Sequence, residues 1–146
     1  MFNPNYSLFI LSSSGSTYYP NPKSNVERDH LKYFKFIGRM IGKALFDGCL
    51  LECYFVKSLY KIIIGEPLAF SDLEDFDNEY YNNLKWCLQN DVSCLMTSFV
   101  LEQDFFGKMV EIELIPNGKN IPLDNTNKME YVEKLTHYRL YRSIQE

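Results

Sequence analysis

The 146-residue sequence lacks a long apolar run, a basic leader and any C-x-x-C pair, and it contains only two histidines. No stretch approaches the roughly 18 apolar residues of a membrane-spanning helix, and no basic segment followed by an apolar one opens the chain. We therefore expect no membrane span and an intracellular protein, located in the cytoplasm, with the nucleus as a second location.

The scarcity of cysteine and histidine argues against a metal site. The four cysteines are Cys49, Cys53, Cys87 and Cys94. A structural zinc site usually combines one cysteine knuckle with a second knuckle or a histidine pair, so Cys49 and Cys53 supply only half of one. So few cysteines in a chain of this length also argue against a disulfide framework. We expect free cysteines that pack as small hydrophobic side chains, with no metal and no cofactor.

Positive charge is also in short supply. The chain has 15 Lys and Arg against 19 Asp and Glu, which gives a net charge of −4 and a pI near 5.2. Phosphate neutralisation needs a positive surface, so we expect no nucleic-acid partner. With 46% hydrophobic and 23% charged residues, the composition is that of one folded domain rather than a disordered tail.

Apolar spacing predicts an α+β fold that is mainly helical, with a small antiparallel sheet or hairpin towards the C-terminal side. Residues 2–25 are rich in Asn, Pro, Ser and Gly, which favours extended segments and turns. Helices are expected over residues 24–46, 52–64 and 77–89, and a last helix from a capping box of Asn127 and Glu130. Strands are expected over residues 99–105 and 108–115, with a short third strand over 121–123 kept at an edge by Pro122.

The first predicted helix combines a broad apolar arc with a basic stripe. The stripe consists of Lys32, Lys35, Arg39 and Lys43. It is either a docking surface or an ordinary solvated helix face, and the solvated face is the commoner case. Gly38 and Gly42 lie one turn apart and would let another backbone approach, so we expect a packing reason for them.

The last predicted helix carries two apolar stripes instead of one. One stripe consists of Met129, Leu140 and Ile144, and the other of Tyr131, Leu135 and Tyr138. Because an ordinary surface helix needs only one, the second stripe must be covered either by more of the same domain or by a partner. The residues alone favour burial within the domain, since Tyr is common at core margins.

No constellation of residues assembles an active site. The sequence has no G-x-S-x-G, no phosphate-binding glycine loop and no H-E-x-x-H. Asp29 and His30 could form an acid–base pair, but a cap carboxylate beside a hydrogen-bonded histidine is much commoner. The carboxylates within residues 72–79 lead into helix starts, where negative charge is favourable. The residues therefore indicate a binding module or part of a larger protein.

Several segments, in order along the whole chain, resemble the HECT-type ubiquitin-protein ligase domain. They are residues 1–9 (MFNPNYSLF), 19–24 (YPNPKS), 29–48 (DHLKYFKFIGRMIGKALFDG), 79–86 (EYYNNLKW), 106–107 (FG), 113–118 (ELIPNG) and 127–132 (NKMEYV). Each segment is weak alone, and together they are specific. The resemblance implies a ubiquitin-protein transferase as the parent protein.

In that family a large N-lobe and a smaller C-lobe are joined by a flexible hinge. A charged conjugating enzyme docks on the N-lobe, and its ubiquitin passes to a C-lobe cysteine and then to a substrate lysine. The resemblance implies that residues 1–146 are part of the N-lobe, with 1–78 mostly in its large subdomain and 79–146 in the subdomain that binds the conjugating enzyme. It also implies that the C-lobe is absent, that none of the four cysteines is catalytic and that this fragment is inactive alone.

The resemblance also implies two protein-binding sites. The groove for the conjugating enzyme would consist of Tyr80, Leu84, Leu95, Tyr131 and Leu135. A second, non-covalent ubiquitin site, the exosite, would include Tyr6 and Phe106.

Three further expectations follow from the resemblance. Protein substrates would be chosen by regions that this chain does not contain. The alternative function is a non-catalytic interaction module that retains only the fold of the lobe. We also expect uncovered apolar surface on Leu140 and Ile144, and hence self-association of the fragment.

Overall fold

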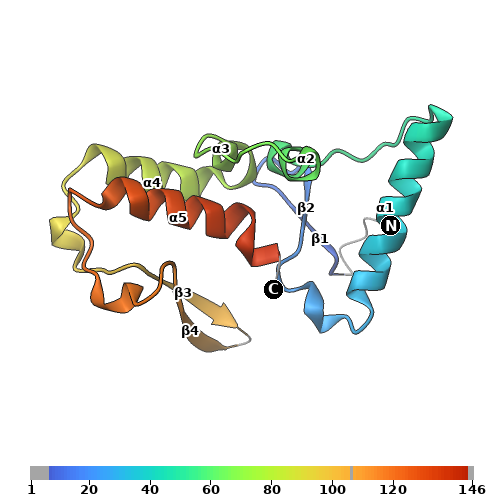
Figure 1. The fold of residues 1–146 in the computed structure, drawn as a ribbon. Coiled ribbons are helices and arrows are strands. Elements are labelled where there is room, and N and C mark those ends of the chain that lie inside the picture. The colour runs from blue at the N-terminus through green and yellow to red at the C-terminus, as the bar shows by residue number, and fades with distance from the viewer. Residues whose placement is uncertain (1–6, 106, 145–146) are drawn as a thin grey trace.

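Five α-helices and two short antiparallel hairpins form the part of the chain that the computed structural model describes, residues 7–105 and 107–144 (Figure 1). The helices are α1 (His30–Asp47), α2 (Lys57–Ile64), α3 (Asp72–Phe76), α4 (Asn78–Gln89) and α5 (Lys128–Leu140). The strands are β1 (Phe9–Leu11), β2 (Tyr18–Pro20), β3 (Val100–Phe105) and β4 (Lys108–Glu113). The predicted α+β class is confirmed. None of the described helices is long and apolar enough to cross a membrane.

The N-terminal hairpin anchors the start of α2. β1 pairs with β2 in antiparallel register, with Ile10 opposite Tyr19. The backbone of Tyr18 then continues the pairing on its other side. Its N–H donates to the carbonyl of Tyr54 at 2.8 Å, and its own carbonyl accepts from the N–H of Val56 at 3.1 Å. Residues 54–56 are therefore extended, and α2 begins at Lys57, five residues later than the apolar spacing predicts.

Tyr19 links three distant parts of the chain. Its side chain is fully buried, and its ring lies 4.4 Å, centroid to centroid, from that of Phe76 at the end of α3. Its hydroxyl donates a 2.7 Å hydrogen bond to the carbonyl of Leu140, the last residue of α5. A buried hydroxyl or carbonyl that loses its hydrogen-bond partner destabilises the fold, so both groups must stay in place. The hairpin, α3 and α5 are therefore held in one arrangement.

The same chain covers the two apolar stripes of α5 except at Met129, which is 67% exposed. Val132, Leu135, Tyr138 and Leu140 all belong to the main core cluster. Burial within the domain is thus confirmed for Leu135 and Tyr138. The expectation of exposed surface on Leu140 is wrong, because Leu140 has no exposed surface and Ile144 also packs against this cluster.

Helix α1 contributes less to the core than its sequence predicts. It begins at His30, because residues 24–26 form a separate 3-10 turn. Only Ile37 and Ala44 on this helix are buried, whereas Leu45 of the same predicted arc is 75% exposed. In Figure 1 α1 stands apart from α4 and α5, joined to α2 by residues 48–56.

The β3–β4 hairpin matches the two strands predicted from alternation. Val100 lies opposite Glu113, and Phe105 lies opposite Lys108. The expected third strand is reduced to a single bridge between Ser98 and Pro122. Proline has no N–H with which to extend the ladder, so the pairing ends there.

The capping box of α5 lies three residues earlier than predicted. Asn127 makes no side-chain cap. Instead, the Asp124 N–H donates to Asn127 Oδ1 at 2.9 Å, and the Asn127 N–H donates to Asp124 Oδ1 at 3.0 Å. This reciprocal pair fixes the entry of the chain into α5 in the way that a conventional capping box does.

The Tyr19→Phe variant tests whether the link to α5 stabilises the whole domain. Removing the hydroxyl leaves the buried carbonyl of Leu140 without its partner, so the free energy of unfolding should fall by about 1–3 kcal/mol. Urea unfolding followed by circular dichroism measures this change, with Tyr54→Phe as the control because Tyr54 is 66% exposed. Equal unfolding midpoints for the two variants would contradict the assigned role.

Candidate functional site

The described residues contain no cluster suited to metal binding or nucleophilic catalysis. No group of three or more His, Cys, Asp or Glu residues is placed to hold a metal ion in the part of the chain that the structure covers. Burial raises the pKa of the Cys53 and Cys87 thiols, which disfavours the reactive thiolate. Cys49 and Cys94 are exposed, so the expectation that the free cysteines are buried hydrophobic residues is wrong for these two.

Asp29 and His30 do not act as a pair. Asp29 forms an ion pair with Lys32 at 2.7 Å, and His30 Nδ1 lies 3.1 Å from the hydroxyl oxygen of Ser24. Each side chain therefore has a separate local partner, which favours the structural interpretation over an acid–base pair.

Asp77 confirms that a carboxylate within residues 72–79 stabilises the start of a helix. It caps α4 by accepting from the N–H of Tyr80 at 3.1 Å, and it forms an ion pair with Arg139 of α5 at 2.9 Å. One carboxylate therefore both starts α4 and ties it to α5. This holds the two helices that carry most of the predicted groove residues side by side (Figure 1).

Tyr131 lies where the two core clusters meet. It packs against both clusters, and its ring lies 5.3 Å edge-to-face from the ring of Phe99. Burial raises the pKa of Tyr131, with a contribution from Cys87, while a hydrogen bond with the Thr97 side chain opposes the shift. The hydroxyl of Tyr131 therefore faces the turn that ends at Thr97.

That turn presents two apolar side chains to solvent. Leu95 is 43% exposed, and Met96 is 94% exposed and has a left-handed backbone with φ of 47°. Asp91 holds the turn by accepting from the N–H of Ser93 at 2.9 Å and from Asn125 Nδ2 at 2.7 Å. These two bonds are the main reason that the pKa of Asp91 is lowered. Leu95 and Met96 thus sit on a turn that is fixed to the segment before α5.

Tyr80 is more buried than a residue in direct contact with a partner protein usually is. Its ring packs against the main core, and the Arg139 guanidinium lies 5.4 Å from the ring centroid. Burial raises the pKa of Tyr80 to about 12, although the positive charge of Arg139 lowers it. Tyr80 therefore lies at the margin of the site and connects it to the core.

The structure places some of the predicted groove residues near the surface and others in the core. Leu84 and Leu135 are only 4% and 3% exposed, inside the core. Their burial does not fit direct contact with a partner, and they support the helices from within. The predicted exosite residues, Tyr6 and Phe106, lie outside the described residues.

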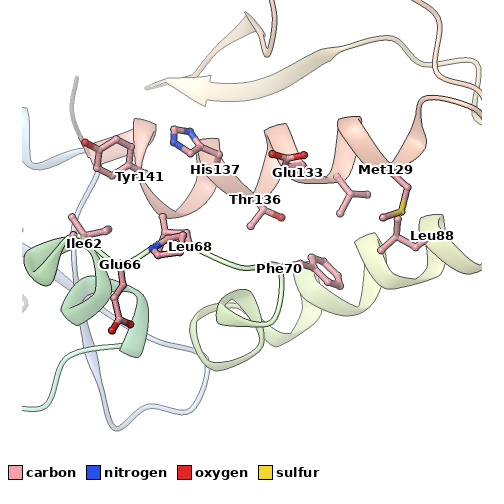
Figure 2. Close-up of a pocket in the computed structure, with 13 residues that line it drawn as sticks. Ile62, Glu66, Leu68, Phe70, Leu88, Met129, Glu133, Thr136, His137 and Tyr141 are labelled. Carbon is pink, nitrogen blue, oxygen red and sulfur yellow. The ribbon is translucent and has the colours of Figure 1, made fainter.

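Two features of the surface were missed by sequence reasoning. The first is Met96, because a methionine next to a Ser-Cys-Leu turn gives no signal of its exposure. The second is a hollow of about 660 Å³ between α5 and the segment around residues 62–70. Figure 2 shows Thr136 directed from α5 towards the loop that carries Leu68 and Phe70. This hollow depends on tertiary packing, so no local pattern could have predicted it.

The sequence matches the HECT-domain (ubiquitin-transferase) family over residues 1–146. The chain therefore belongs to the HECT-domain family, as its sequence segments predict.

The curated relatives are named as ubiquitin ligases. The chain is 47% identical to E3 ubiquitin-protein ligase TOM1-like of Neurospora crassa and 43% identical to E3 ubiquitin-protein ligase ptr1 of Schizosaccharomyces pombe, in each case over all of its length. It is 44% identical, over 99% of its length, to E3 ubiquitin-protein ligase HACE1 of Danio rerio. It spans only 4%, 5% and 16% of these three relatives, respectively.

A pH titration tests the environment of Tyr80. Because folding raises its pKa from 10.0 to about 12, the unfolded chain loses this proton first. The contribution of the protonated Tyr80 hydroxyl to the free energy of unfolding is complete below pH 10 and is lost as the pH rises towards 12. In Tyr80→Phe, the fall in unfolding free energy between about pH 9 and pH 11 should be about 1 kcal/mol smaller than in the wild type.

The matched control for this titration is again Tyr54→Phe, at an exposed position. The measurement is the urea midpoint at each pH. If Tyr80→Phe followed the same pH dependence as the wild type, the assigned burial of the Tyr80 hydroxyl would be wrong.

Proposed function

We propose that this chain is part of a HECT-type ubiquitin-protein ligase and that the surface around Leu95 and Tyr131 docks a ubiquitin-conjugating enzyme. Membership of the HECT-domain family and the names of the relatives support the ligase function. The observation that carries the docking surface is the exposure of Leu95 and Met96 on a fixed turn beside Tyr131.

Direct contact is proposed for the residues that reach the surface. Leu95 and Met96 would supply apolar anchors, and Tyr131 would supply a ring with a polar end. Tyr80 lies at the margin, whereas Leu84 and Leu135 hold α4 and α5 in place from within the core. Residues 79–146 would thus form the binding part, and residues 1–78 would support it through the contacts of Tyr19.

A fixed turn is well suited to a partner that must bind and leave. Little side-chain or backbone order is lost on binding when the anchors are already held in place. An interface built on two exposed apolar side chains and one partly buried ring is small, so its affinity should be micromolar or weaker. Such a complex fits the handover of ubiquitin from one enzyme to another.

The transfer of ubiquitin would use a cysteine other than the four in this chain. In HECT-type ligases ubiquitin passes to a cysteine that follows a threonine, and none of the four cysteines in this chain does. The raised pKa of Cys53 and Cys87 also makes these two thiols poor nucleophiles at neutral pH. The proposed task of this chain is therefore docking. A purely non-catalytic interaction module is the alternative, and no observation favours it.

Substitution of Leu95 tests the docking surface with little effect on the fold. Leu95→Ala should weaken binding of the cognate conjugating enzyme several-fold, because loss of an interface anchor commonly costs more than about 1 kcal/mol. Tyr131→Ala should weaken it as well, after its folding has been checked. Isothermal titration of the chain against a panel of conjugating enzymes measures both effects.

The matched control for this titration is Met109→Ala on β4, because Met109 is 66% exposed but lies away from the turn. It should bind as the wild type does. Saturable binding that is unchanged in Leu95→Ala and Tyr131→Ala would overturn the proposed surface while leaving the family assignment intact.

A further inference from the structure

The turn of residues 91–97, which carries the two exposed apolar anchors, is attached at both ends to the segment that precedes α5. At its start, Asn125 Oδ1 accepts from the N–H of Val92 at 3.2 Å. At its end, the carbonyl of Thr97 accepts from the N–H of Leu123 at 2.9 Å. Because this segment runs directly into α5, the contacts that hold the turn also set its position relative to that helix.

Asn125 joins this segment to three consecutive residues of the turn. Besides the bond from Val92, its Nδ2 donates to Asp91 Oδ1 at 2.7 Å and lies 3.5 Å from the hydroxyl oxygen of Ser93. Asp91 Oδ1 also accepts from the N–H of Ser93 at 2.9 Å. Val92 is fully buried, whereas residues 93–96 are exposed. The amide of Asn125 therefore acts at the boundary between the buried and the exposed part of the turn.

The backbone at Met96 shows that the exposed part of the turn is held under strain. Met96 lies in the left-handed region, with φ of 47° and ψ of 36°. A residue other than glycine seldom adopts this conformation, which persists only where the surrounding structure imposes it. The Met96 side chain is 94% exposed, so its own packing does not impose the conformation. The attachments at the two ends of the turn, including the bonds of Asn125, must therefore do so.

We propose that Asn125 is a positioning residue for the docking surface, an inference that rests on the docking function proposed above. Its side chain holds the start of the turn, and the turn then presents Leu95 and Met96 in a fixed geometry beside Tyr131. Without this side chain the backbone at Met96 relaxes and residues 93–96 sample several conformations. The affinity for the partner then falls in proportion to the population that keeps the binding geometry.

The helices on either side of the turn do not depend on the Asn125 side chain. Asn125 is exposed, and the entry into α5 is fixed by the reciprocal pair of Asp124 and Asn127, which does not include it. Val92 remains part of a buried cluster with Phe99 whether or not the amide is present. Removing the amide should therefore release the exposed part of the turn while α4 and α5 stay folded.

Nuclear magnetic resonance relaxation of the free chain tests the positioning role without any partner. In the wild type the backbone order parameters of residues 93–96 should be about 0.85, as in a rigid backbone, and in Asn125→Ala they should fall below about 0.6. Those of α4 and α5 should not change. The matched control is Asn21→Ala, because Asn21 also makes two hydrogen bonds to backbone groups, with Ser7 and Lys23, but lies directly after β2. It should leave the turn rigid.

Isothermal titration with a conjugating enzyme that binds the wild type completes the test. Asn125→Ala should weaken binding about fivefold although every anchor is still present, and Asn21→Ala should bind as the wild type does. In the Leu95→Ala background the same substitution of Asn125 should weaken binding by a smaller factor, because part of what the turn presents is already missing. Such non-additivity is expected when one residue acts through another.

Several results would overturn the positioning role of Asn125. Unchanged order parameters in Asn125→Ala would do so whatever the affinity, because any loss of binding would then come from direct contact. A loss of order that includes α4 and α5 would show a general role in folding, and equal losses of affinity in both backgrounds would show independence from Leu95. A wild type that binds no conjugating enzyme would instead overturn the docking function itself, so the two failures are distinguishable.

Discussion

The hydrogen bond from Tyr19 to the carbonyl of Leu140 is the constraint on which the rest of the arrangement depends. It joins residues 121 positions apart and lies in the core, where an unpaired hydroxyl or carbonyl would be costly. By fixing the end of α5 against the N-terminal hairpin, it also sets the position of α5 along α4. Tyr131 lies more than two helical turns before Leu140, so this anchoring also sets its location.

A second contact sets the angle between the same helices. Asp77 starts α4 and pairs with Arg139, whose guanidinium lies over the rings of Phe76 and Tyr80. The core on one side of α5 and the Asp91 turn on the other then leave two surfaces open, one at Leu95 and Met96 and the other at the hollow between α5 and residues 62–70. Both surfaces are consequences of how α5 is held.

The sequence predicts the fold better than it predicts the surface. Helices α4 and α5 and the β3–β4 hairpin follow from apolar spacing and turn residues, and they lie within a few residues of the predicted bounds. The start of α2 could not be predicted, because the pairing of Tyr18 with residues 54–56 is a long-range contact. The same holds for the groove residues. Resemblance selects Leu84 and Leu135 as readily as Leu95 and Tyr131, and only packing shows which of them are buried.

The central claim is that the turn at Leu95 and Met96, together with Tyr131, docks a conjugating enzyme. Nuclear magnetic resonance of the isotope-labelled chain, titrated with an unlabelled conjugating enzyme that binds it, tests this claim most directly. The account predicts amide shifts concentrated at residues 92–98 and around Tyr131, with residues 62–70 unaffected. Shifts concentrated on α1 or on residues 62–70, with residues 92–98 unchanged, would contradict it.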